Sequence, residues 1–121
     1  MSAQLSRDDW KNKADGLSYR NQAFIGGKYV AALSGKTFDC INPATGKILT
    51  QVAACDKEDV DVAVKVARAA FEGGKWSNMA PARRKAIMQK FAALLLKHND
   101  ELALLETLDM GKPIQYSLSV D

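Results

Sequence analysis

The chain has 121 residues and a net charge of +3, with 47% hydrophobic and 26% charged residues. This balance is typical of a globular protein rather than a disordered one, and the length allows one domain with a hydrophobic core. Two cysteines are too few for a disulfide scaffold, so we expect Cys40 and Cys55 to remain thiols in a reducing compartment. The sequence has neither an apolar run of about 18 residues nor the apolar core of a signal peptide, so we expect a cytoplasmic chain without a membrane span.

The distribution of charge disfavours a nucleic-acid binder. Residues 1–55 carry seven Lys or Arg against four Asp or Glu, whereas residues 56–121 carry ten of each class. A nucleic-acid surface usually needs a denser basic face with aromatic side chains among the charges. The basic run at residues 83–85 falls within a helical pattern, and we interpret it as a solvated helix face.

We assign residues 1–22 to an N-terminal arm. Asp8, Asp9 and Trp10 predict the start of a short helix in this arm, because acidic side chains favour the first turn of a helix. Gly16 and the polar residues after it predict its end.

Residues 23–55 predict β structure. Gly26-Gly27 separates two short strands and supplies the positive φ angles of a tight hairpin turn. Residues 37–41 alternate apolar and polar side chains, and a proline-containing turn that Gly46 ends leads to a return strand at residues 47–53. Two successive hairpins predict a small antiparallel meander.

Residues 56–121 predict helices. Asp56 suits a helix N-cap, and Asp59 three residues later completes a pattern similar to a capping box. Apolar residues then recur at helical spacing until Gly73-Gly74, which predicts the end of the first helix.

Two further helices follow, and residues 114–121 predict the start of another. Pro81 suits the first turn of the second helix, Asn99-Asp100 cap the third, and Gly111 lies where the third should end. The apolar stripe of the second helix comprises Ile87, Phe91, Leu94 and Leu95, and the expected core residues of the third are Leu102, Leu105 and Leu108.

The residues on their own show no catalytic constellation. A cysteine nucleophile needs a partner base, and the chain has a single histidine, His98, at the end of a predicted helix. We interpret Cys40 and Cys55 as structural side chains, and their spacing does not suit a zinc site. No glycine fingerprint for a dinucleotide is present.

Several motifs follow one another at consistent spacing between Trp10 and Asp121. They include FIGGKY at residues 24–29, INPATG at residues 41–46, and ELALLETLDMGKP at residues 101–113. This ordered set resembles the start of an aldehyde dehydrogenase. Within that family the chain looks most like the bacterial aminoaldehyde enzymes, in particular γ-glutamyl-γ-aminobutyraldehyde dehydrogenase.

The resemblance implies an α/β fold in which this chain supplies the N-terminal β-hairpins and helices that pack beside the NAD(P)-binding domain. Residues 56–121 would then be a helical part of that cofactor-binding domain, incomplete and continuing beyond the chain. Family members are several-fold longer, so the resemblance implies that residues 1–121 are the first part of an enzyme.

For the complete enzyme, the resemblance implies oxidation of an aldehyde to a carboxylic acid with NAD or NADP. A cysteine forms a thiohemiacetal, hydride passes to the cofactor, and the resulting thioester is hydrolysed. The substrate would be an aminoaldehyde of polyamine catabolism, and the enzyme a homo-oligomer, dimer or tetramer, with neither nucleic acid nor membrane as partner. The family's catalytic and cofactor-binding residues lie beyond Asp121, so we assign none here and expect this part alone to be inactive.

Two weaker assignments follow from the same resemblance. Some family members bind a monovalent cation, K⁺ or Na⁺, through main-chain oxygens at positions matching Cys40 and Ile41 and the carboxylate matching Asp109. The alternative is that Asp109 bonds local backbone near its helix end. Val120 matches a position that lines the substrate tunnel, although a buried helix residue would look the same.

An alternative from another functional class is a free-standing, non-catalytic α+β module for protein interaction. The predicted last helix reaches Asp121 without a cap or breaker. We therefore favour the enzyme over the module.

Overall fold

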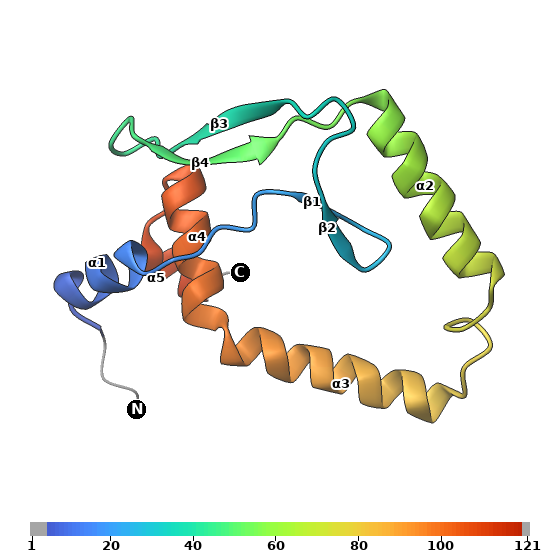
Figure 1. Ribbon diagram of the computed structural model, residues 1–121. Coiled ribbons are helices and arrows are strands. Elements are labelled where there is room, and N and C mark those ends of the chain that lie inside the picture. The colour runs from blue at the N-terminus through green and yellow to red at the C-terminus, as the bar shows by residue number, and fades with distance from the viewer. Residues whose placement is uncertain (1–4, 120–121) are drawn as a thin grey trace. The chain divides into compact units, whose positions relative to one another are not determined.

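The computed structural model describes residues 5–119 (Figure 1). Its elements are α1 (Arg7–Asp15), β1 (Ala23–Ile25), β2 (Lys28–Val30), β3 (Thr37–Ile41), β4 (Ile48–Ala53), α2 (Lys57–Glu72), α3 (Pro81–Lys97), α4 (Asn99–Met110) and α5 (Ile114–Ser119). The chain divides into two units. The first unit holds the described parts of residues 1–20, 40–50 and 98–121, and the second holds residues 21–39 and 51–97.

The helix α1 confirms the expected short helix in the arm, but its cap is Ser6, which the sequence reading missed. The backbone N–H and the hydroxyl of Ser6 both donate to Asp9 Oδ2, at 2.9 and 2.6 Å, and the backbone N–H of Asp9 donates to Ser6 Oγ at 3.2 Å. These bonds to the Ser6 side chain and backbone hold the pKa of the Asp9 carboxyl below its ordinary value. The helix ends at Gly16, as expected.

The first hairpin has the expected turn. Strands β1 and β2 pair antiparallel with Ala23 opposite Val30, and Gly26 and Gly27 between them have φ angles of 62° and 80°. Both turn residues therefore lie in the left-handed region, which glycine occupies at little cost.

The predicted meander is wrong, because β1–β2 and β3–β4 form two separate two-stranded sheets. The segment between β2 and β3 bonds elsewhere. The backbone N–H of Leu33 donates to the carboxylate of Asp59 in α2 at 2.8 Å, and the N–H of Gly35 donates to the carbonyl of Ala32 at 2.8 Å. A backbone group committed to these bonds is not available to extend a strand ladder.

The start of α2 is held by a buried carboxylate. Asp59 is only 4% exposed, and its Oδ2 accepts the backbone N–H of Asp56, the N-cap residue, at 3.1 Å. Its Oδ1 accepts the Leu33 N–H, so one side chain joins the β2–β3 loop to the first turn of α2. The helix ends at Glu72, directly before Gly73 and Gly74, as expected.

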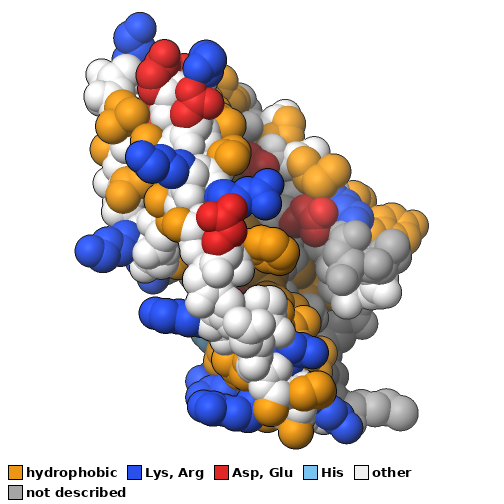
Figure 2. Space-filling view, turned by 90° about the vertical axis from the view of Figure 1, so that its right-hand side faces the viewer, with side chains coloured by type: hydrophobic (Ala, Val, Ile, Leu, Met, Phe, Trp, Pro, Cys, Tyr) orange, Lys and Arg blue, Asp and Glu red, His pale blue; other side chains and the backbone are white. Residues whose placement is uncertain are grey.

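The helix α3 leaves its apolar stripe exposed. It begins at Pro81 as expected, and the Arg84 guanidinium donates to the carbonyls of Ser77 and Met79, which ties the preceding loop to the first turn. The four stripe residues are 44–53% exposed, namely Ile87, Phe91, Leu94 and Leu95. Hydrophobic side chains reach the surface among charged ones on the face drawn in Figure 2. None of the helices within residues 5–119 combines the length and apolarity needed to cross a membrane.

The buried face of α4 differs from the expected one. Ala103 and Leu104 are 3% and 4% exposed, whereas Leu102 is 45% exposed. Leu105 and Leu108 are half-buried. The reason is that α5 and α1 pack against α4 and cover one of its sides. Thr107 lies on this side with Ala103 and Leu104, because residues three and four positions apart share a helix face. Thr107 Oγ1 lies 3.3 Å from the hydroxyl oxygen of the buried Ser117 in α5.

We predict that Asp59→Ala lowers the free energy of unfolding of the chain by about 1 kcal/mol, because it leaves two part-buried backbone donors without their acceptor. The measurement is urea unfolding followed by circular dichroism. Asp61→Ala is the matched control on the same helix, since it removes only an exposed pair with Lys57 and should cost less than about 0.5 kcal/mol. Equal losses in the two variants would contradict the role given to Asp59.

Candidate functional site

Cys40 stands near the end of β3, directly before a well-defined turn. The side chain of the buried Asn42 accepts the backbone N–H of Ala44 at 2.9 Å, and the N–H of Asn42 donates to the carbonyl of Lys47 at 2.9 Å. These bonds fix the chain just after Cys40 and Ile41. The side chain of Cys40 is half-buried, and that of Ile41 is exposed.

Asp109 lies in the last turn of α4, where the helix dipole is negative and a carboxylate is unfavourable. The turn contains no basic residue to offset that charge. Gly111 ends the helix with a φ of 79°, and a β-carbon built on it would lie 3.1 Å from Cγ of Pro43. The end of α4 therefore packs against the turn that follows β3.

The two ends meet through a thiol and a carboxylate. Cys40 Sγ lies 2.9 Å from Asp109 Oδ1 and donates its hydrogen to it. This bond is the main reason why the pKa of the Cys40 thiol is raised, with burial and the negative charge of Asp109 acting in the same direction. Burial also raises the pKa of Tyr19, and the Cys40 thiolate that forms at high pH adds to that shift.

The contact between Cys40 and Asp109 brings together residues that are expected from the sequence at a monovalent-cation site, and Ile41 directly follows Cys40 in the chain. Carboxylate and main-chain carbonyl oxygens are hard donors. Within residues 5–119, His, Cys, Asp and Glu side chains do not gather in threes as a metal site built from side chains would require.

The other residues singled out from the sequence lie apart from this pair. His98 precedes α4, and its Nδ1 lies 3.1 Å from Glu101 Oε2. Cys55 is an exposed free thiol in the other unit. Val120, the expected tunnel residue, lies outside the described residues.

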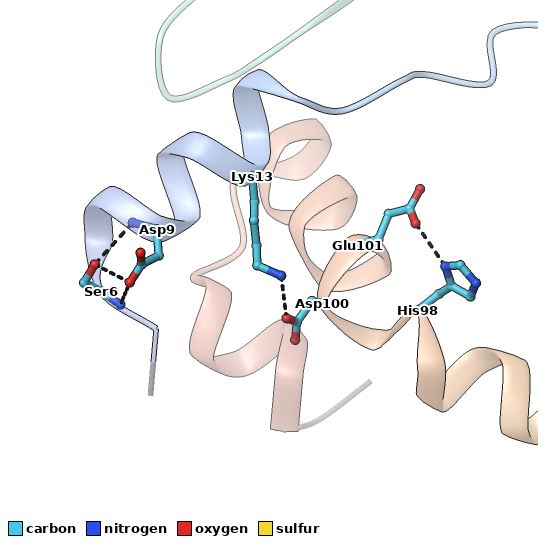
Figure 3. A network of polar contacts seen from close by, with 6 residues as sticks. All are labelled: Ser6, Asp9, Lys13, His98, Asp100 and Glu101. Carbon is cyan, nitrogen blue, oxygen red and sulfur yellow. Dashed lines mark hydrogen bonds and ion pairs between the residues drawn. The ribbon is translucent and has the colours of Figure 1, made fainter. Parts of the chain in front are cut away.

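The first unit also contains an open cavity of about 950 Å³ between α1, the start of α4 and α5. Lys13, which lines it, pairs with Asp100, with Nζ and Oδ2 2.9 Å apart (Figure 3). The same Nζ lies 5.7 Å from the centre of the Trp10 ring. Both partners of the pair are partly exposed, so the pair contributes at most about 1 kcal/mol to stability. It helps to hold α1 on α4.

The contact between the Cys40 thiol and Asp109 was not expected from the sequence. Only the main-chain oxygen of Cys40 was expected at this place, and any side chain would serve for that. The two residues are 69 positions apart, so no local spacing signals their contact.

A model of the aldehyde dehydrogenase family matches residues 29–120. This match confirms the family expected from the ordered motifs.

Individual relatives agree with the family match. Aminoacetaldehyde dehydrogenase of Pseudomonas aeruginosa is 50% identical over 95% of this chain and 23% of its own length. The NADP/NAD-dependent aldehyde dehydrogenase PuuC of Escherichia coli is 46% identical over 93% of this chain and 23% of its own. The crystal structure of γ-glutamyl-γ-aminobutyraldehyde dehydrogenase from Burkholderia cenocepacia superposes with a TM-score of 0.94, at 47% identity, over 97% of this chain and 24% of that one. The chain thus spans less than a third of the length of these proteins.

We predict that Cys40 reacts with iodoacetamide more slowly than Cys55 near pH 8, because a raised pKa leaves less of the reactive thiolate. Asp109→Ala removes the bonded carboxylate, lowers the pKa of Cys40 and should accelerate its alkylation. Mass spectrometry of the two cysteine peptides gives both rates in one sample, with Cys55 as the internal control. Equal acceleration at Cys55, or none at Cys40, would contradict the contact.

Proposed function

The chain belongs to the aldehyde dehydrogenase family, and we propose that it is the N-terminal part of an enzyme that oxidises an aminoaldehyde to a carboxylic acid with NAD or NADP. The single observation that carries this proposal is the family match over residues 29–120. The names of the relatives support the substrate class and the cofactor, and the shared fold supports a common architecture.

In this proposal the chain contributes structure rather than reacting groups. The nucleotide, when bound, would accept hydride from the substrate, and we assign no described residue to hold it. The catalytic cysteine and its general base would belong to a segment outside these 121 residues. Cys40 is unsuited to act as the nucleophile because its thiol donates to a carboxylate that raises its pKa.

We propose further that Asp109, with the main-chain oxygens of Cys40 and Ile41, holds K⁺ or Na⁺. The support is electrostatic, since a cation there would offset a carboxylate placed at the negative end of α4. Such an ion would join the end of β3 to the end of α4 within the first unit. A potassium or sodium titration of the unfolding temperature tests it.

We also propose that the enzyme is a cytoplasmic homo-oligomer. This proposal is supported by the exposed apolar side chains of α2 and α3, which another protein surface would cover. That surface would come from the rest of a longer chain or from a second subunit. The exposed side chains include Val60, Val64, Phe71 and Phe91. Both cysteines are free thiols, which suits a reducing compartment. Light scattering on the purified protein measures the number of subunits, and a monodisperse monomer would contradict the oligomer.

We predict that the protein encoded by the complete reading frame forms NADH or NADPH when given an aminoaldehyde, whereas residues 1–121 alone form none. The measurement is the absorbance of the reduced nucleotide with aminoacetaldehyde as the test substrate. A complete protein that binds neither nucleotide nor aldehyde would contradict the proposal and favour the non-catalytic interaction module.

We predict from the sequence alone that Val120→Trp raises KM for bulky aldehydes more than for short ones, because the new ring would narrow the proposed tunnel. The substitution is made in the complete protein, and steady-state kinetics with two aldehydes of different size measure the effect. Unchanged KM values for both substrates would remove Val120 from the tunnel.

A further inference from the structure

We propose that the thiol of Cys40 is a positioning residue for Asp109, holding its carboxylate in the orientation that binds the cation. This inference rests on the proposed cation site and extends it from the main chain of Cys40 to its side chain. The observation that carries it is the 2.9 Å contact between Cys40 Sγ and Asp109 Oδ1.

The contact leaves the carboxylate able to bind an ion. An ionised carboxylate has two oxygens and about four acceptor positions, and the thiol hydrogen occupies one of them on Oδ1. By this count the thiol does not occupy Oδ2 or the remaining position on Oδ1. The thiol therefore restricts the rotation of the Asp109 side chain without taking its place as a ligand.

Both ends of the contact stand on fixed backbone. On one side, Asn42 is buried and its bonds to Ala44 and Lys47 hold the turn after β3. On the other side, Gly111 ends α4 in the left-handed conformation, close to Pro43. A hydrogen bond between two fixed segments can determine the orientation of the Asp109 carboxylate. A hydrogen bond between mobile segments would move with them and fix no orientation.

The chemistry of the donor makes the inference testable. Groups that orient a metal ligand typically change metal affinity by about 10- to 100-fold when removed. Cys40→Ala keeps the main-chain oxygen but removes the side-chain donor. Cys40→Ser keeps a donor, because the serine hydroxyl can donate to a carboxylate in place of the thiol.

The experiment uses the protein encoded by the complete reading frame and follows its unfolding temperature as K⁺ or Na⁺ replaces choline at constant ionic strength. A bound ion stabilises the folded state in proportion to its occupancy, so the titration yields an apparent affinity without an activity assay. The variants are Cys40→Ala, Cys40→Ser and Asp109→Asn. Cys55→Ala is the matched control, since it removes an exposed thiol in the other unit.

We expect Cys40→Ala to weaken the apparent affinity about tenfold. Cys40→Ser should restore it to within about threefold of the parent, and Cys55→Ala should leave it unchanged. A parent protein that responds to K⁺ or Na⁺ while Cys40→Ala responds equally or more strongly would overturn the role of the thiol and leave the cation site standing. If the unfolding temperature of the parent protein does not respond to K⁺ or Na⁺, both proposals are overturned. The same holds if Asp109→Asn keeps the full response of the parent.

Discussion

The buried carboxylate of Asp59 is the constraint on which the arrangement of the second unit depends. A charged oxygen removed from water must find donors, and Asp59 finds two on the backbone, at Asp56 and Leu33. The first bond starts α2, and the second holds the loop after β2 against that start. The backbone N–H of Leu33 thus donates to Asp59 and not to a neighbouring strand, and β1–β2 and β3–β4 form two separate sheets.

A second carboxylate has a corresponding place in the first unit, with the opposite electrostatics. Asp59 lies in the first turn of its helix, where negative charge is favoured, whereas Asp109 lies in the last turn of α4, where it is not. The thiol of Cys40 offsets part of that cost by donating to Asp109. The negative charge that remains at this helix end is the physical reason for the cation proposed there, and the family match places the chain in the aldehyde dehydrogenase family.

Local chemistry was enough to predict most elements. Gly26-Gly27 identified the first hairpin turn, and Asp56, Gly73-Gly74 and Gly111 marked helix ends that the structure confirms. Long-range contacts were the source of the errors. The burial of Ala103 and Leu104 depends on α5 packing against α4. The Leu33–Asp59 and Cys40–Asp109 bonds join residues 26 and 69 positions apart, for which the sequence carries no periodic signal.

The central claim is that these residues are the N-terminal part of a dehydrogenase whose catalytic groups lie in a following segment. Sequencing the source reading frame past Asp121 tests it most directly. The account predicts that the frame continues through a glycine-rich cofactor segment and then a glutamate and a cysteine at the family's positions. A natural stop codon directly after Asp121 would contradict the account and leave a non-catalytic module.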